Sequence, residues 1–285
     1  MKSQGRRNTG PRPSARDAAR TAIVALLDLP PVLAKLALAS VFPQPSTTTP
    51  SGLVRVAADF GSIVRRLGVV IEVREAQRVP EEGGLVFMWN QESHLDHLVL
   101  ASAIPRPFFS LFNNEVARVP FYGSHMEASG HVHVDRKDEL QWREGVARAA
   151  SRVAAGECVL VSPEGTRSWD GQLLPMKRGA FMLAMLSRRP IVCMTVVGGH
   201  ARMPRGSAVV RPGPIRVVFS DPIAVREGDP EDVEARSSLG ARGSDVRGGE
   251  DAARAPLGER LLGRARGVSP GTSSRGSSST LRCLD

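Results

Sequence analysis

The chain has 285 residues, of which 41% are hydrophobic and 24% are charged, and this balance is typical of a globular protein. A wholly disordered chain, a collagen-like chain and a polytopic membrane protein are therefore excluded. The formal net charge of +9 is a feature of nucleic-acid-binding proteins, but it lies at the two ends of the chain. Residues 1–20 hold six basic residues and one acidic residue, residues 236–285 hold nine and five, and residues 21–235 hold 23 of each. Because the central region is neutral, we expect no nucleic-acid partner.

The N-terminal segments differ in composition. Residues 1–20 are basic and show no apolar periodicity, which predicts a disordered arm. Residues 21–42 are apolar, but Asp28, Lys35 and a proline pair interrupt them, and a transmembrane helix needs about 20 largely uninterrupted apolar residues. We therefore predict two short apolar helices, separated by the prolines, that lie at a membrane interface or pack on the domain. A secretory signal is the alternative for this segment, and residues 43–52 form a Pro/Ser/Thr-rich linker.

Residues 53–235 alternate between strand-like and helical patterns. The strand-like runs are Val69–Val73, Leu85–Trp89, Phe108–Phe112, His131–Val134, Val159–Val161, Ile191–Val197 and Ile215–Phe219. The helical patterns are Leu95–Ser102, Glu139–Ala155 and Gly179–Arg188. This alternation predicts an α/β domain in which helices flank a central mixed, partly parallel sheet. In such sheets, functional sites gather where strands lead into helices.

The C-terminal segment, residues 236–285, has a different composition. Ser, Gly and Arg fill 27 of its 50 positions, and the last aromatic residue of the chain is Phe219. Such a segment cannot bury enough apolar surface to offset the entropy lost on ordering. We therefore predict a disordered low-complexity tail.

The three cysteines, Cys158, Cys193 and Cys283, are too widely spaced to form a metal or redox pair such as C-x-x-C. Cys158 and Cys193 lie in apolar runs, which favours buried free thiols in a reducing compartment. This cysteine usage indicates a cytoplasmic location.

The first segment that suggests chemistry follows the run Leu85–Trp89. A buried strand leads into a polar loop that holds Ser93, His94 and Asp96, and an apolar helix follows. A histidine beside a carboxylate at such a point can serve as an oriented general base. The alternative is structural: Ser93 caps the helix, Asp96 favours its positive end, and His94 only packs.

The second segment, Gly130–Arg136, is a strand that ends in an Asp-Arg pair. Arg136 can hold a phosphate group through two hydrogen bonds. The alternative is a surface cation opposite Asp138 or Glu139.

The third segment, Val159–Ser168, is a strand that enters a sharp turn with Pro, Glu, Gly, Thr and Arg, and Lys177 precedes the next helical pattern. Exposed backbone N–H groups and a helix N-terminus complement phosphate. A turn with only a structural role does not require these charged and hydroxyl side chains together. The segment therefore predicts a site for an anionic ligand.

Together these segments resemble the glycerolipid (lysophospholipid) acyltransferase superfamily, which contains the bacterial 1-acylglycerol-3-phosphate acyltransferases. Gly130 through Arg136 match the family's second motif, Val161 through Ser168 match the third, and Pro190 through Val196 match a fourth, which is a proline-led apolar strand. The motifs occur in the family's order and spacing over about residues 53–222. The resemblance implies the family's α/β fold and an O-acyltransferase of phospholipid biosynthesis.

The first motif departs from the family at its histidine. The family has four residues between this histidine and an aspartate, and aligning Asn90, Ser93 and Asp96 on the motif puts Gln91 at the histidine position. A carboxamide has no basic lone pair near neutral pH, so Gln91 cannot accept the proton of the acceptor hydroxyl. We therefore expect His94 to be the base, with Asp96 beside it. The alternative is that catalysis is weakened or lost.

The resemblance also implies the binding residues and the substrates. It assigns Arg136, Arg167 and Lys177 to the phosphate of a glycerol-phosphate acceptor such as lysophosphatidate, and Glu164, Gly165 and Thr166 to the walls of the same pocket. It implies no metal and no permanently bound cofactor, because the acyl donor is a thioester of coenzyme A or of acyl carrier protein. Acyl chains and products reside in membranes, which implies a peripheral or monotopic protein at the cytoplasmic face of the membrane.

Three functional interpretations remain. The leading one is an acyltransferase that acts on lysophosphatidate or a related lysolipid. The second is a non-catalytic lipid-binding protein on the same fold, motivated by Gln91. The third and weakest is a nucleic-acid binder, motivated only by the net charge.

Overall fold

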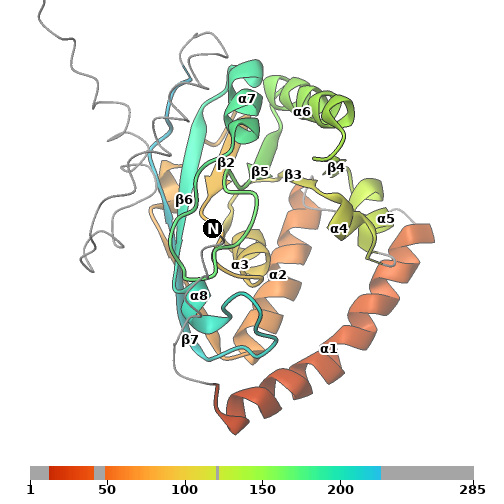
Figure 1. The fold of residues 1–285 in the computed structure, drawn as a ribbon, viewed down its shortest axis with the longest axis vertical. Coiled ribbons are helices and arrows are strands. Elements are labelled where there is room, and N and C mark those ends of the chain that lie inside the picture. Colours follow the sequence, from red (N-terminus) through yellow and green to blue (C-terminus); the bar gives the residue numbers. More distant parts are fainter. Residues whose placement is uncertain (1–12, 42–48, 120–121, 226–285) are drawn as a thin grey trace, which may run out of the picture.

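A computed structural model describes residues 13–41, 49–119 and 122–225 of the chain. Its centre is a seven-stranded sheet with the strand order β1-β7-β6-β2-β5-β3-β4, and helices cover both of its faces (Figure 1). The strands are β1 (Val69–Arg74), β2 (Leu85–Trp89), β3 (Phe109–Phe112), β4 (Val132–His133), β5 (Cys158–Val161), β6 (Ile191–Val197) and β7 (Gly213–Phe219). The longer helices are α1 (Ala15–Val41), α2 (Pro50–Arg66), α3 (Asp96–Ala103), α6 (Glu139–Ala154) and α7 (Arg178–Ser187). Shorter helical segments are η1 (Ala76–Arg78), α4 (Asn114–Ala117), α5 (Tyr122–Ala128) and α8 (Gly199–Arg202).

The sheet is mixed, as the sequence predicts. Strands β4, β3, β5, β2 and β6 pair in parallel, β7 pairs antiparallel with β6, and β1 pairs in parallel with β7. The parallel strands therefore present their carboxyl ends at one edge of the sheet. This edge is where ligand sites form in α/β domains.

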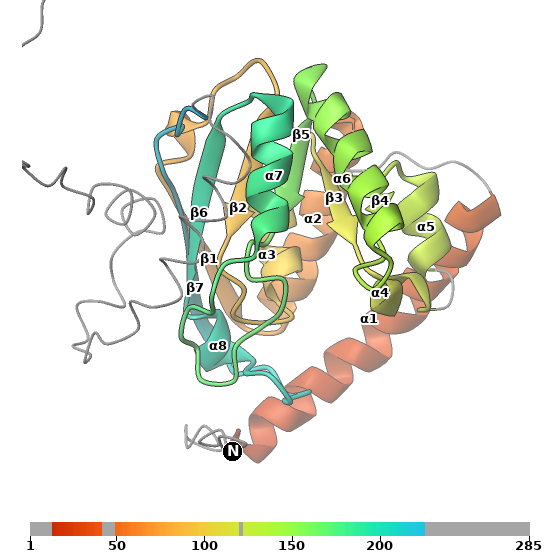
Figure 2. The same cartoon turned by 45° about the horizontal axis from the view of Figure 1, so that its top comes forward.

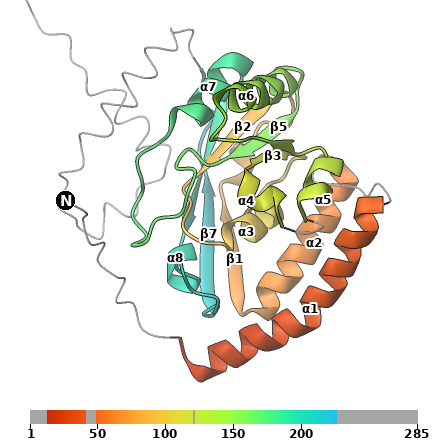
Figure 3. The same ribbon diagram turned by 45° about the vertical axis from the view of Figure 1, so that its right-hand side comes forward.

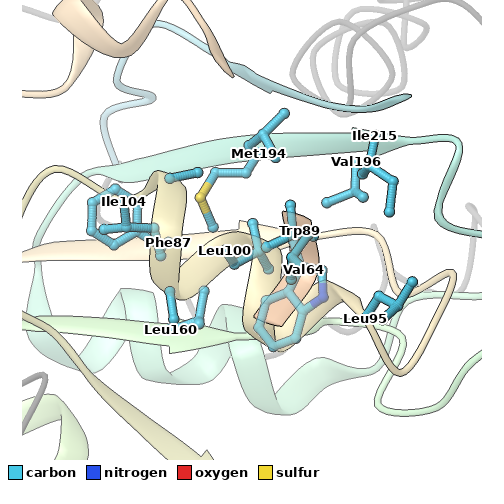
Figure 4. Close-up of a cluster of buried hydrophobic side chains, with 14 of the residues drawn as sticks. Val64, Phe87, Trp89, Leu95, Leu100, Ile104, Leu160, Met194, Val196 and Ile215 are labelled. Atoms are coloured by element: carbon cyan, nitrogen blue, oxygen red, sulfur yellow. The ribbon is translucent and has the colours of Figure 1, made fainter. Parts of the chain in front are cut away.

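Two apolar clusters hold the helices on the sheet, one on each face. Strand β2 is buried on both faces and contributes to both clusters, because successive side chains of a strand point to opposite faces. Phe87 and Trp89 face α2 and α3, where Val64 and Leu100 join them (Figure 4). Burying a large apolar side chain stabilises the fold by about 1.5–3 kcal/mol. The central strand therefore gives the loop that follows it a rigid support.

The N-terminal helix differs from the prediction of a disordered arm and two short helices. Helix α1 begins at Ala15, inside the predicted arm, and continues through Pro30 and Pro31. Its start is explained by a capping box, in which the backbone N–H of Asp17 donates to Ser14 Oγ and that of Ser14 donates to the Asp17 carboxylate. A proline pair usually ends or kinks a helix, but Val24 in the core and an ion pair between Asp28 and Arg66 fasten this helix to the domain before the prolines.

Helix α2 begins at Pro50, within the segment that the sequence predicts as a linker. The Thr49 side chain accepts a hydrogen bond from the backbone N–H of Gly52, and proline at the first helical position needs no donor there. The helix packs beside α1 and α3 (Figure 3). The predicted tail, the first 12 residues of the predicted arm and residues 43–48 of the predicted linker lie outside the described residues.

Within the described residues, no helix is long and apolar enough to cross a membrane. Cys158 and Cys193 are buried free thiols, which confirms the prediction for these two residues. Cys283 lies outside the described residues.

Candidate active site

The three segments that suggest chemistry meet at the carboxyl edge of the parallel strands. The loop after β2, the segment between β4 and α6 and the loop between β5 and α7 all leave the sheet there (Figure 2). The last of these loops passes beside α8, and a Cβ added at Gly171 would lie 3.0 Å from the His200 ring. The site is therefore built from loops that are anchored in the parallel part of the sheet.

Asn90 fixes the loop after β2 to the neighbouring strand. Its Nδ2 donates to the carbonyl of Val196 at 2.8 Å, and its Oδ1 accepts the backbone N–H of the same residue at 2.7 Å. The carboxamide thus continues the ladder between β2 and β6 beyond the last residue of β2. This contact gives Asn90 a positioning role.

Glu164 joins the first and third segments. Its Oε1 accepts the backbone N–H of Gln91 at 2.7 Å, and its Oε2 accepts that of Leu174 at 2.7 Å. Only 2% of Glu164 is exposed, and burial raises the pKa of its carboxyl while the two backbone donors lower it. The predicted pocket residue therefore acts as a bridge between two loops.

Asp96 is fully buried at the start of α3. Its Oδ2 accepts the backbone N–H groups of Glu92 at 2.7 Å and Ser93 at 2.8 Å. Its Oδ1 has no hydrogen-bond partner among the residues that the structure describes, and a Cβ added at Gly199 would lie 2.8 Å from this atom. Burial raises the pKa of Asp96 well above its usual range.

His94 lies in the same loop, but its side chain is exposed. No hydrogen bond or ion pair joins His94 to Asp96 in the described part of the chain, because the Asp96 carboxylate is turned to the loop backbone. Partial burial, followed by the positive charges of Arg167 and Arg205, lowers the pKa of His94. The lowered pKa favours the neutral imidazole, which is the form that can accept a proton.

Arg136 and Lys177 converge on the turn at Gly165. Nη1 of Arg136 donates to the carbonyl of Gly165 at 2.7 Å. Gly165 has a positive φ of 64°, and a Cβ added there would lie 2.7 Å from Arg136 Nη1 and 3.3 Å from Lys177 Nζ. Both cations are exposed, and Lys177 precedes the first residue of α7. The second and third segments thus form one cationic group that suits an anionic ligand.

Arg167 lies two residues beyond Gly165 in the same loop. Its pKa is lowered by burial and by Arg205, and is raised by the nearby carboxylate of Asp96. Its Nη1 is buried and makes no hydrogen bond within the described residues. Thr166, the remaining predicted pocket residue, is exposed on the same turn.

Sequence reasoning missed Arg205 and Trp169. Nη1 of Arg205 donates to the carbonyl of Arg167 at 2.7 Å, and its guanidinium carbon lies 4.4 Å from the centroid of the Trp169 ring. The Pro-Arg-Gly turn that contains Arg205 is a local signal for an ordered loop. Its proximity to the third segment depends on the tertiary fold.

Glu92 was missed as well. Its Oε2 accepts the backbone N–H of His200 at 3.1 Å, which ties the loop after β2 to α8. Burial raises its pKa to about 7, against the opposing effect of the backbone donors of Gly198, Gly199 and His200. The signal that could have found it is the acidic side chain directly after Gln91.

No group of three or more His, Cys, Asp or Glu residues in the described ranges could hold a metal ion. The two histidines of the second segment bond to protein groups: His131 Nδ1 accepts the backbone N–H of Ser110 at 3.0 Å, and His133 Nε2 lies 2.6 Å from Asn114 Oδ1. The absence of a metal and of a permanent cofactor stays a prediction.

Comparison with known proteins places this site in a family context. Residues 70–197 match the family model described as Acyltransferase. A 1-acyl-sn-glycerol-3-phosphate acyltransferase of Cocos nucifera is 30% identical over 149 residues, which cover 52% of this chain and 48% of that protein. A protein of the same name from Limnanthes alba is 29% identical and is covered to 58%. The chain thus spans about half the length of these curated relatives.

The fold also matches a solved structure. The crystal structure of the 1-acyl-sn-glycerophosphate (LPA) acyltransferase PlsC from Thermotoga maritima superposes with a TM-score of 0.61 at 16% identity, covering 81% of this chain and 98% of that one. The likeness confirms the predicted fold class. The family match and the curated relatives confirm the resemblance that the motifs indicate.

Proposed function

We propose that this chain, whose residues 70–197 match the Acyltransferase family model, transfers a fatty acyl group to the free hydroxyl of lysophosphatidate or a related lysolipid. The observation that carries the proposal is the convergence of Arg136 and Lys177 on Gly165, at the same sheet edge as His94. An anion-binding group at the same sheet edge as an imidazole suits an acceptor that has both a phosphate and a hydroxyl. The names of the curated relatives support this choice of acceptor.

The reaction exchanges a thioester for an ester. The acceptor oxygen attacks the carbonyl carbon of the acyl thioester while His94 accepts the hydroxyl proton. The carbon–sulfur bond then breaks, and the leaving thiolate takes up a proton to become a free thiol. Asp96 has a positioning role, because it holds the backbone of Glu92 and Ser93 and does not contact His94.

The donor is a thioester of coenzyme A or acyl carrier protein, and neither requires a permanently bound cofactor. The acceptor is a membrane lipid, so we propose a peripheral or monotopic location at the cytoplasmic face of the membrane. Helix α1 supports this proposal, because Ile23, Leu26 and Leu27 are 57%, 74% and 63% exposed and share one helix face by their spacing. The Lys and Arg residues of the N-terminal arm would add attraction to anionic lipid, at about 1 kcal/mol per side chain near the surface.

A second candidate function is lipid binding without efficient catalysis. Two observations favour it: Gln91 occupies the family's histidine position, and Asp96 Oδ1 has no hydrogen-bond partner in the described part of the chain. Such a protein would bind the lysolipid through the same cationic group but would transfer no acyl group.

The experiment that separates the two candidates is an acyl-transfer assay with the purified full chain in detergent or vesicles. It uses a panel of lysolipids and both donor types. We expect turnover of a phosphate-bearing lysolipid. Saturable binding of that lysolipid with no turnover of either donor would contradict the proposal and support the second candidate.

A further inference from the structure

Trp169 is an exposed aromatic residue beside the candidate active site. Its side chain is 60% exposed, although aromatic side chains normally contribute buried apolar area. The guanidinium of Arg205 stacks on its ring at 4.4 Å and is held there by its hydrogen bond to the carbonyl of Arg167. The ring and the cation therefore form a fixed platform, which we call the Trp169–Arg205 platform.

The platform belongs to a second cationic group of the site. The first group, Arg136 and Lys177, surrounds Gly165. The second, Arg167 and Arg205, lies close enough to His94 for both charges to lower the pKa of that imidazole. Both substrates of the proposed reaction carry negative charge at a distance from the reacting atoms. The site has two cationic groups and the reaction has two anionic substrates. One group therefore suits the acceptor and the other suits the donor.

The chemistry of the platform indicates which donor it fits. An exposed indole face with an adjacent guanidinium is suited to a planar base linked to phosphate, since bases stack on aromatic rings and phosphates pair with arginine. Coenzyme A ends in such a unit, an adenine with phosphate groups on its ribose. Recognition of acyl carrier protein, an acidic protein surface, requires cations but no exposed stacking ring.

We propose that Trp169 and Arg205 bind the nucleotide end of a coenzyme A thioester, with the indole stacked on the adenine and the guanidinium paired with a phosphate. The inference specifies the donor of the proposed acyltransferase. Binding of the nucleotide itself requires no turnover and can be measured separately.

The first test is equilibrium binding of coenzyme A and of pantetheine, which lacks the nucleotide, to the full chain. We expect Trp169→Ala and Arg205→Gln each to weaken coenzyme A binding by about tenfold, with no effect on pantetheine. Matched controls are Leu140→Ala and Arg143→Gln, because both residues are exposed on α6. Equal affinity of all variants for coenzyme A would overturn the proposal, even if the chain transfers acyl groups.

The second test compares three donors that share one acyl thioester. We expect Trp169→Ala to raise KM for acyl-CoA about tenfold and to leave KM for acyl-pantetheine and acyl-(acyl carrier protein) unchanged. An equal effect on all three donors, or a loss of binding to anionic vesicles with unchanged KM for acyl-CoA, would overturn the assignment. If no donor is turned over but coenzyme A binding depends on the platform, the proposed function fails and this inference stands.

Discussion

The carboxylate of Glu164 accepts the backbone N–H of Gln91 at 2.7 Å. The contact involves the main chain of Gln91, so it does not depend on which side chain the residue carries. Position 91 can therefore be substituted without removing the bridge between the loop after β2 and the loop after β5. This arrangement makes Gln91 a suitable position at which to separate the two candidate functions.

Gln91→His tests whether the missing family histidine limits catalysis. General acid–base catalysis contributes about 10²–10⁴-fold to a rate. If His94 already serves as the base, the substitution changes kcat by less than about tenfold. The measurement is the initial rate of acyl transfer to lysophosphatidate, with Gln91→Asn as the control. A gain of about 10²-fold from an almost inactive wild type would show that catalysis has been lost in this chain.

Arg136→Ala tests the cationic group at Gly165. Hydrogen bonds to charged groups contribute about 1.5–3 kcal/mol, so we expect KM for lysophosphatidate to rise roughly 10- to 100-fold. KM for a monoacylglycerol, which has no phosphate, stays unchanged. Lys137→Ala is the matched control, since Lys137 is the exposed neighbouring cation. An equal rise for both acceptors would exclude phosphate recognition by Arg136.

Arg205→Gln tests the electrostatic link to His94. The positive charge of Arg205 disfavours the protonated imidazole, so its removal raises the pKa of His94. The base is active when deprotonated, and the acidic limb of the profile of kcat/KM against pH therefore moves to higher pH. The control is Arg143→Gln, which removes an exposed positive charge on α6. We expect it to leave the acidic limb at the same pH. If the acidic limb of the kcat/KM profile stays at the same pH in Arg205→Gln, His94 is not the group that titrates there.

Glu92 provides a test through stability. Its pKa rises from 4.5 to about 7 on folding, so the folded protein holds this proton more tightly than the unfolded chain. The free energy of unfolding therefore decreases as pH rises from 4.5 to about 7, by at most roughly 3 kcal/mol from this group. Glu92→Gln should remove this contribution while keeping an acceptor for the N–H of His200. Chemical denaturation across this pH window measures the free energy of unfolding of both proteins. An equal dependence of this free energy on pH in wild type and variant would contradict the raised pKa of Glu92.

The apolar strands were predictable because they are buried on both faces. The runs predicted for β2 and β6 have the same bounds as the strands, since continuous hydrophobic stretches bounded by turn residues are typical of central parallel strands. Helix α2 was missed, although Thr49 and Pro50 form a recognisable helix start. The continuous helix α1 was also missed, because local rules predict a break at its proline pair and its anchoring depends on tertiary contacts.

The sequence was sufficient to predict which segments form the site, but not the side-chain contacts within it. Parallel strands bring the three motifs to one edge of the sheet, and the family resemblance identified Gln91 as the departure. The orientation of Asp96 toward the loop backbone follows from the path of the loop and is not encoded in residue spacing. The contact between Arg205 and Trp169 requires two loops that lie far apart in sequence to meet, so no local pattern predicts it.

We propose that this chain catalyses acyl transfer with His94 as the base. The most direct measurement is the rate of ester formation from acyl-CoA and lysophosphatidate by wild type and His94→Ala, at equal folded protein concentration. Since the side chain of His94 is exposed, its removal should leave the thermal unfolding curve unchanged. We predict that wild type turns over and that His94→Ala loses about 10²-fold or more in kcat. Equal rates for the two proteins would contradict the account.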